Sequence, residues 1–432
     1  MTPWPRMKVG RVARLISGVG FPHQYQGKTS GVHPFLKVSD LASAVSGYHL
    51  VTSQNWVGQA DLVSLGARLA PKGAIVFPKV GAAMLKNPRR LLDLPAAMDN
   101  NLMAVVPSSG EPRFWLYALS TIDLGEFSAG GALPYVNEGQ IRDLHIPFPS
   151  VEQQRRIADF LDAETARIDH LTRLRNKQVS TLEERYGAAI SELTTPGIST
   201  SERRSSIWPW LPEELTTVRL GYLARVQSGV TVHNARTGDS EDATFPYLRV
   251  ANVQGEAVDL TEIKEITVPR PMAMRSMLHP GDVVMTEANG NPDNLGRGAV
   301  WRGEIANMIH QNHVFAIRVD REKLIPEYLS ALLAASHGRR YFRFTSAQVG
   351  IATTSSSKVL NFPVPARTTS QQTAVVREYE TLRSAANRAQ SALMRQLSLL
   401  TERRQALITA AVTGQFDVST ASGRNVTEGV SA

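Results

Sequence analysis

The residues that could carry chemistry are few, and they form no complete catalytic set. The glycine-rich segment 290–298 (GNPDNLGRG) lacks the lysine of a phosphate-binding Walker loop, which favours a turn beside a strand. His310 and His313 have no third ligand or supporting carboxylates, so we predict no metal site. Asp282 and Glu287 could imitate a nuclease carboxylate pair, yet no lysine follows Glu287 at the usual spacing. The sequence therefore favours binding over catalysis.

Basic side chains next to aromatic ones suggest contacts with an anionic polymer. Residues 339–343 (RRYFR) interleave guanidinium and aromatic groups, and residues 86–90 (KNPRR) form a basic turn. Such groups contact phosphates, and arginine also forms bidentate hydrogen bonds with guanine. Ordinary solvated surface charge remains an open alternative for each of them. The predicted DNA-binding residues are Lys37, Lys79, Lys86, Arg89, Arg90, Arg249, Arg297, Arg339, Arg340, Tyr341 and Arg343.

The composition limits the class of protein. The chain has 432 residues, no cysteine and a formal net charge of +8, of which residues 1–150 carry +5. Without cysteine there can be no thiolate zinc site, disulfide or catalytic thiol. No apolar run approaches the ~20 residues of a membrane span, so we expect a soluble, cytoplasmic protein with no membrane partner. The positive charge is compatible with an anionic partner, although ordinary soluble proteins often carry a similar excess.

The sequence repeats itself once along its length. Ser-Gly-Val at 17–19 recurs at 228–230, and Phe-Leu-Lys-Val at 35–38 recurs as Tyr-Leu-Arg-Val at 247–250. Further matches follow in the same order, with offsets that stay between 208 and 218 residues. Each match alone is weak, but their collinear order predicts two related halves of about 212 residues, separated by small insertions.

Two long amphipathic helices are expected, at 151–194 and 370–415. Each follows a proline-marked segment, and apolar residues recur at spacings of three, four and seven. At ~1.5 Å per residue, each rod would be roughly 65 Å long, and its apolar stripe must be covered. We expect the two rods to pair antiparallel; packing on their own modules or homodimerisation are the alternatives. The predicted coil and subunit contacts are Ile157, Leu161, Ile168, Leu182, Tyr379, Leu382, Leu393, Leu400 and Leu407.

The rest of each half has short β-rich runs and one short amphipathic helix, at 112–119 and 326–337. The predicted fold class is α+β, with two homologous modules, two long helices in an antiparallel coiled coil, and a pseudo-two-fold internal repeat. The predicted boundaries are a first module at 1–150, helical regions at 151–196 and 370–415, a linker and second module at 197–369, and a disordered tail at 416–432.

Two helical segments resemble a known family. IPFPSVEQQRRIADFLD (146–162) is similar to the central conserved region of the specificity subunits of type I restriction-modification systems, and ERRQALITAAVTGQ (402–415) is similar to the end of their distal conserved region. HQNHVF (310–315) also resembles a segment of their recognition domains. The second helix departs from the pattern, because Gln371 and Gln372 preserve only part of the Glu-Gln-Gln of the first.

The resemblance implies a non-catalytic subunit. Each module would be a target recognition domain for one half of an asymmetric, bipartite site in double-stranded DNA, and the helices would set the unread spacer. The helices would also dock two modification (methyltransferase) subunits, and restriction (translocase and endonuclease) subunits would join that core. S-adenosylmethionine, ATP and Mg²⁺ would be used by these partners, with no cofactor bound by this chain. The alternative is a coiled-coil protein-interaction scaffold that does not recognise DNA sequence.

Overall fold

The structure is a computed structural model that describes residues 4–42, 48–50, 53–128, 133–231, 242–347, 351–415 and 418. Apart from Val418, the predicted tail at 416–432 lies outside the described residues. The chain divides into two compact units: unit 1 contains residues 1–176 and 394–432, and unit 2 contains residues 177–393. Within the described part of the chain, no helix is both long enough and apolar enough to span a membrane.

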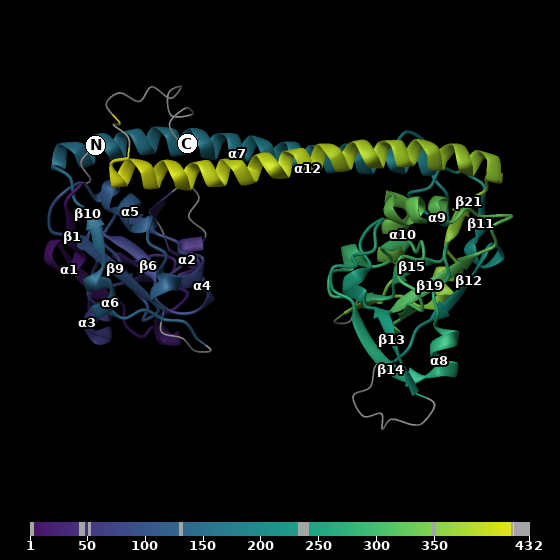
Figure 1. Cartoon of the computed structure of the whole chain (residues 1–432), viewed down its shortest axis with the longest axis horizontal. Helices are drawn as coiled ribbons and strands as arrows, with labels where there is room; N and C mark the ends of the chain where they lie inside the picture. The colour runs from purple at the N-terminus through teal and green to yellow at the C-terminus, as the bar shows by residue number, and fades with distance from the viewer. Residues whose placement is uncertain are drawn as a thin grey trace. The chain divides into compact units, whose positions relative to one another are not determined.

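In unit 1, module 1 is built on a five-stranded sheet with the order β2-β9-β6-β7-β4. Its strands β9 and β6 consist mostly of buried residues, and helix α5 packs on the sheet (Figure 1). The elements are β1 Arg6–Lys8, α1 Val9–Val12, β2 Ala13–Ser17, β3 His33–Leu36, α2 Val38–Ala42, β4 His49–Leu50, β5 Trp56–Val57, α3 Gln59–Leu65, β6 Ile75–Pro78, α4 Ala82–Leu85, β7 Arg90–Leu92, β8 Ala97–Met98, β9 Leu102–Pro107, α5 Pro112–Ser120, α6 Glu138–Asp143 and β10 His145–Pro147.

In unit 2, module 2 is built on a four-stranded sheet with the order β12-β19-β15-β17, and α9 packs on it. A second sheet has the order β14-β13-β18. The elements are β11 Thr217–Arg219, β12 Ala224–Ser228, β13 Asp242–Leu248, β14 Lys264–Pro269, α8 Arg270–Arg275, β15 Val283–Thr286, β16 Ala288–Asn289, β17 Gly298–Val300, β18 Ile309–His310, β19 Val314–Val319, α9 Pro326–Ala334, α10 Ser336–Thr345, β20 Ala352–Thr353, α11 Ser356–Leu360 and β21 Pro363–Pro365.

The predicted internal repeat is confirmed at the level of strand pairing. Ala13 pairs with Pro107 between β2 and β9, and Ala224 pairs with Val319 between β12 and β19, so the register is conserved at offsets of 211 and 212. The order β2-β9-β6-β7 in module 1 corresponds to β12-β19-β15-β17 in module 2. The variation in the offset between matching residues of the two halves therefore comes from the loops, because the paired strands keep the same register.

The repeated Ser-Gly-Val segment has a structural reason. A Cβ on Gly18 would lie 1.8 Å from the Asp99 carbonyl oxygen, and one on Gly229 would lie 2.0 Å from the His310 carbonyl oxygen. Both distances are far below any real contact, so each position requires glycine. The same close backbone approach is thus built into both modules.

Helices α7 (Val151–Thr194) and α12 (Thr369–Thr413) are shared, because each contributes one part to each unit. In unit 2 they run antiparallel: Glu183 accepts a hydrogen bond from Gln390 (3.2 Å), and further along α7 the Leu193 carbonyl accepts one from Arg367 (3.0 Å). In unit 1, Asp169 of α7 forms an ion pair with Arg404 of α12 (3.2 Å). Along the apolar stripe, Ile157, Leu161, Ile168, Tyr379 and Leu407 are buried, and Leu182, Leu382, Leu393 and Leu400 are half-buried.

Two elements differ from the expectation. The predicted helix at 326–337 ends at Ala334 because Ala335 is extended (ψ 164°), and α10 begins directly after it. Residues 197–217, expected as a linker, include Trp208 and Trp210, which pack against the core of module 2. The Trp208 ring lies 5.1 Å from that of Tyr341, and the two tryptophan rings are 5.6 Å apart. This segment is therefore tied to the module by aromatic contacts.

Candidate nucleic-acid interface

The basic turn of module 1 contains one buried and one exposed cation. Lys86 is exposed at the end of α4, whereas the Arg89 side chain is only 2% exposed. Arg89 lies over the Phe77 ring (4.9 Å) and donates to Asn87 Oδ1 (2.9 Å) and the Pro88 carbonyl (3.0 Å). Burial lowers the pKa of Arg89 to about 9. The prediction that Arg89 contacts DNA does not fit this position, because the guanidinium braces the turn from inside.

The other predicted cations of module 1 are half-buried. Lys37 donates to Gln26 Oε1 (3.1 Å), and Lys79 directly follows β6. Arg90 donates to the Arg89 carbonyl (2.9 Å), and burial lowers the pKa of its guanidinium. These three side chains keep part of their surface in solvent, so they stay predictions for DNA contact.

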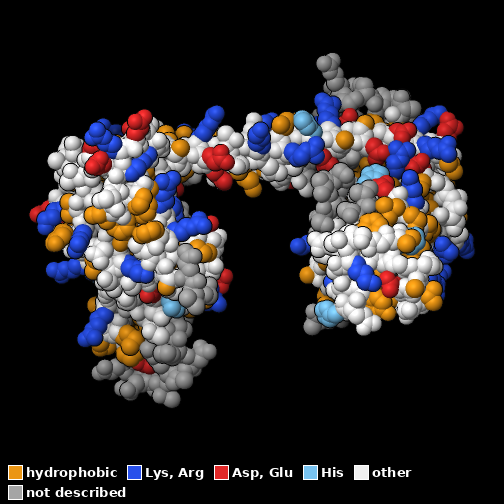
Figure 2. All heavy atoms as spheres, turned by 180° about the vertical axis from the view of Figure 1, so that it is seen from behind, with side chains coloured by type: hydrophobic (Ala, Val, Ile, Leu, Met, Phe, Trp, Pro, Cys, Tyr) orange, Lys and Arg blue, Asp and Glu red, His pale blue; other side chains and the backbone are white. Residues whose placement is uncertain are grey.

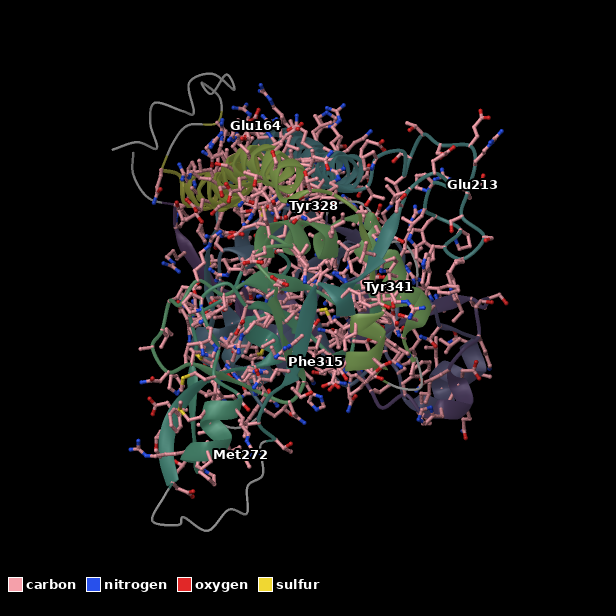
Figure 3. All side chains as sticks on the ribbon, turned by 90° about the vertical axis from the view of Figure 1, so that its right-hand side faces the viewer. Glu164, Glu213, Met272, Phe315, Tyr328 and Tyr341 are labelled. Carbon is pink, nitrogen blue, oxygen red and sulfur yellow. The ribbon has the colours of Figure 1, made fainter. Side chains whose placement is uncertain are left out.

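The aromatic and basic run of module 2 lies on α10, whose two faces differ. Tyr341 is 1% exposed and donates to the Lys358 carbonyl (2.7 Å), and Figure 3 shows it inside the module. The prediction that Tyr341 contacts DNA therefore does not fit its buried position either. Arg340 and Arg343 lie on the exposed face, and Arg343 forms an ion pair with Asp293 (3.1 Å).

Arg339 and Arg343 of α10 lie beside the segment 293–297. Arg339 donates to the Leu295 carbonyl, and its pKa is lowered to about 10, first by burial and then by the charge of Arg297. Asp293 partly offsets this positive charge. Together with Arg343, these residues form the basic cluster of module 2, and the structure brings it together from two separate sequence segments.

Lys37 and Arg249 occupy matching places in the two modules. Each follows an inner strand, β3 or β13, and its backbone N–H donates to a side chain three residues ahead, Asp40 (2.7 Å) or Asn252 (2.9 Å). Arg249 also pairs with Glu262 (3.4 Å). On the face that Figure 2 shows, Lys and Arg side chains are scattered among acidic ones over both modules and the helices.

The sequence did not predict the contacts that join each module to the helices. Gln154 of α7 accepts from the Glu111 N–H (3.0 Å) at the start of α5, and Gln372 of α12 accepts from the Ile325 N–H (2.9 Å) at the start of α9. Both glutamines are buried. The signal was present in the repeated Gln-Gln pair, since the preserved part of the motif is the part that binds the module.

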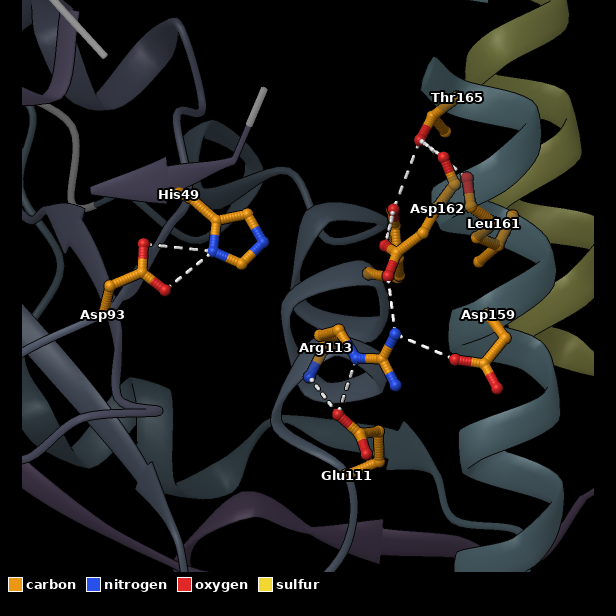
Figure 4. A network of polar contacts seen from close by, with 9 residues as sticks. His49, Asp93, Glu111, Arg113, Asp159, Leu161, Asp162 and Thr165 are labelled. Carbon is orange, nitrogen blue, oxygen red and sulfur yellow. Dashed lines mark hydrogen bonds and ion pairs between the residues drawn. The ribbon is translucent and has the colours of Figure 1, made fainter. Parts of the chain in front are cut away.

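Unit 1 adds an ionic network at the same junction. Arg113 of α5 lies within 2.9 Å of Glu111 and of Asp159, and within 2.7 Å of Asp162 on α7 (Figure 4). Tyr117 also donates to Asp162 (2.7 Å). These contacts fix the first turns of α7 on module 1.

The histidines and carboxylates considered for chemistry have structural partners. His310 is buried, its Nδ1 lies 2.6 Å from the Val314 carbonyl, and burial lowers its pKa. His313 lies 3.6 Å from Glu287, and Asp282 is paired with Arg318 (2.7 Å). Among the residues that the structure describes, no group of three His, Asp or Glu side chains is placed to hold a metal ion.

Comparisons with known proteins agree with this architecture. Residues 1–180 match the family described as "Type I restriction modification DNA specificity domain". The chain is 21% identical over 433 residues to the type I restriction enzyme EcoBI specificity subunit of Escherichia coli, covering 96% of this chain and 86% of that protein. It is 23% identical over 306 residues to the EcoKI specificity subunit of Escherichia coli (strain K12), covering 68% of this chain and 62% of that protein.

One solved structure shares the fold over nearly the whole length. A chain of a structure described as the basis of complex assembly and conformational transition of the type I R-M system superposes with a TM-score of 0.69 at 17% identity. The match covers 96% of this chain and 99% of that chain. The resemblance found in the sequence is therefore confirmed, and this chain is similar to the specificity subunits of type I restriction-modification systems.

Proposed function

We propose that this chain is the DNA-recognition component of a type I restriction-modification complex, in which each module recognises one half of an asymmetric, bipartite target. The observation that carries this proposal is the duplicated module with conserved strand register. The two surfaces are different: the basic turn of module 1 presents Lys86, and module 2 presents Arg340 and Arg343 on a helix. Two different surfaces on one scaffold suit two different half-sites.

The long helices would set the spacer between the half-sites and dock two modification subunits. Four apolar side chains on these helices are exposed within unit 1, and exposed apolar side chains are available for contact with a protein partner. They are Leu171 and Leu174 of α7, and Met394 and Leu399 of α12. Restriction subunits would join this core.

Catalysis would belong to the partner subunits. S-adenosylmethionine would be bound by the modification subunits, and ATP and Mg²⁺ would be used by the restriction subunits. In this chain, the carboxylate and histidine groups that sequence alone could assign to chemistry serve internal contacts, as the Asp282–Arg318 pair illustrates. We therefore expect the purified chain to give no methylation or cleavage by itself.

The decisive experiment is methylation mapping. The chain and its modification partner are expressed together in a host without other methyltransferases, and a host with the modification subunit alone is the control. We expect methyladenine at a single split sequence with an unspecified spacer. An unsplit motif would contradict the two-module proposal. No methylation, together with no salt-sensitive binding of the chain–partner complex to duplex DNA, would favour the scaffold alternative.

A further inference from the structure

In unit 2, a single carboxylate of module 2 is held by both long helices. The hydroxyl of Tyr186 on α7 donates to Glu256 Oε1 (2.5 Å), and the hydroxyl of Tyr379 on α12 donates to the same oxygen (2.6 Å). Arg383, one turn further along α12, donates to the Glu256 backbone carbonyl (2.5 Å). Burial and the neighbouring carboxylate raise the pKa of both phenols, so they remain protonated donors.

The backbone at this point is strained. Glu256 has a φ of 66°, in the left-handed region that residues other than glycine rarely adopt. Its N–H donates to the Gly298 carbonyl (3.1 Å), which fixes the turn to β17. A strained backbone conformation persists when the surrounding contacts hold it in place. Here the contacts around Glu256 hold its carboxylate against the two tyrosines.

Module 2 has a second attachment to the helices. There, Ala331 of α9 and Ala335, which follows α9, pack with Ile190 and Tyr379, and Gln372 accepts from the N–H of Ile325, which precedes α9. A single line of contacts of this kind leaves rotation of module 2 about that line possible. Gln372 and Arg383 are eleven residues apart on α12, or roughly 16 Å, so the Gln372 and Glu256 contacts hold module 2 at two separated points of that helix and oppose such rotation.

Packing alone does not supply this restraint. A cavity of about 200 Å³ lies beside Glu256, and its walls come from α12 on one side and from module 2 on the other. Tyr379, Glu380 and Arg383 line the helix side, and Val258 and Arg302 line part of the module side. Because apolar side chains do not fill this space, the hydrogen bonds to Glu256 supply, at this place, a restraint on the angle between module 2 and the helices that apolar packing does not.

In unit 1, the position of α12 that corresponds to Tyr186 of α7 in the internal repeat makes a similar contact. The offset of 218 that relates α7 to α12 places Arg404 where α7 carries Tyr186. Arg404 stacks on the Tyr48 ring of module 1 (4.7 Å), donates to the Tyr48 hydroxyl (2.5 Å) and pairs with Asp169 of α7 (3.2 Å). The same helical position thus joins both helices to a module in each unit, although the chemistry differs.

We infer that Glu256 is a positioning residue that fixes the orientation of module 2 on the helices and thereby restricts the complex to one spacer length. This inference rests on the proposed function, because spacer length has meaning only for a split target. Glu256 acts through Tyr186, Tyr379 and Arg383, and it need not touch DNA itself.

The first test measures spacer selectivity. The complex of the chain with its modification subunit methylates duplexes that carry both half-sites and spacers one base pair shorter, equal or longer than the natural one. We expect Glu256→Ala to reduce discrimination between these spacers about tenfold without changing either half-site, because it removes charge-assisted hydrogen bonds. Glu256→Gln keeps an acceptor oxygen and should largely restore selectivity. Glu213→Ala removes an exposed carboxylate of the same unit and should have no effect (Figure 3).

The second test measures orientation without DNA. The chain has no cysteine, so Glu265→Cys on module 2 and Arg377→Cys on α12 give two unique spin-label sites within unit 2. We expect Glu256→Ala to broaden the distance distribution between the labels, with Glu213→Ala as control. If Glu256→Ala fails to fold, Tyr379→Phe replaces it, with a smaller change expected in both measurements.

The outcomes separate the two proposals. An unchanged distance distribution in a folded variant overturns the positioning role, whatever the DNA results. A broadened distribution with unchanged spacer selectivity overturns the link to the spacer. If the unmodified complex methylates no split target, the proposed function fails, and with it the spacer consequence, while the distance measurement still decides whether Glu256 orients the module.

Discussion

Within the basic turn at residues 86–90, neighbouring cations have opposite surroundings. Lys86 projects into solvent, and Arg89 is enclosed by Phe77, Asn87 and Pro88. Sequence shows the charges but not the direction of each side chain, because the turn reverses its course within these few residues. A mutation at each position therefore separates a surface role from a structural one.

We expect Lys86→Ala to weaken DNA binding and to reduce the salt dependence of the binding constant by about one phosphate contact, with unchanged thermal stability. Arg89→Ala should instead lower the free energy of unfolding by about 2–4 kcal/mol, because it leaves buried acceptors unpaired and opens a cavity. Salt titrations of DNA binding by the chain–partner complex and urea denaturation of the chain measure the two effects. An unchanged salt slope for Lys86→Ala would remove that residue from the interface.

His337 is held as a neutral imidazole in the core of module 2. Its Nδ1 accepts from the Trp210 indole N–H (3.0 Å), so the proton lies on Nε2, which donates to the Pro363 carbonyl (2.6 Å). Burial lowers the pKa of His337 to about 4. Protonation would break the bond to Trp210 and place a charge among aromatic rings.

This histidine predicts a pH dependence of stability. Its contribution is complete above the unfolded-state pKa of about 6.5 and is lost as the pH falls from there towards 4, because the unfolded chain binds the proton first. At pH 4.5 the loss amounts to roughly 2–3 kcal/mol. Urea denaturation followed by tryptophan fluorescence measures it, since Trp208 and Trp210 lie in this cluster. The difference in stability between the natural chain and His337→Gln should shrink between pH 7 and pH 4.5; a constant difference would contradict the assignment.

At the scale of elements, the long helices were the most predictable part of the chain. Spacings of three, four and seven residues predicted α7 and α12 nearly to their ends, because one periodic signal extends over more than ten turns. Short elements gave weaker signals. The break between α9 and α10 depends on tertiary packing: a Cβ on Gly338 would lie 2.5 Å from the Leu332 carbonyl oxygen, so α10 sits directly against α9.

Buried and exposed leucines of the two long helices should respond differently to substitution in unit 1. Leu161 of α7 is fully buried and Leu399 of α12 is 56% exposed. Leu161→Ala should destabilise the chain by about 2–5 kcal/mol, whereas Leu399→Ala should change the free energy of unfolding by less than about 0.5 kcal/mol. Chemical denaturation measures both. A large loss for Leu399→Ala would show that its surface is covered in the free chain.

At the scale of the whole molecule, the repeat was visible in the sequence, but its contacts were not. Collinear matches predicted two related modules and included the repeated Gln-Gln pair, but they did not show that Gln154 and Gln372 bind the residues at the starts of α5 and α9. The repeat-equivalent positions 186 and 404 hold Tyr and Arg, which no sequence comparison within the chain would align by chemistry. Conserved backbone geometry with changed side chains explains why the fold was more predictable than the interface.

The shared helices predict how the target changes with chain length. Four residues added after Asn176 in α7, together with four before Met394 in α12, lengthen each helix by about 6 Å. At ~3.4 Å per base pair, the methylated target should gain one or two base pairs of spacer and keep both half-sites. Methylation mapping checks this, with an insertion in α7 alone as control, which should disrupt helix pairing. An unchanged spacer would exclude the helices as its determinant.

The division of the chain has a consequence for its synthesis. Unit 2 is continuous, but the core of unit 1 combines side chains from the first 176 residues with side chains from the last turns of α12. Ile157 and Leu161 belong to the same buried cluster as Leu407 and Ile408, so part of this cluster stays uncovered until the last turns of α12 have left the ribosome. Domains usually fold from the N-terminus onward during translation. In this protein the first module to be synthesised is the last to complete its core. A prematurely terminated chain therefore keeps apolar surface exposed to chaperones and proteases.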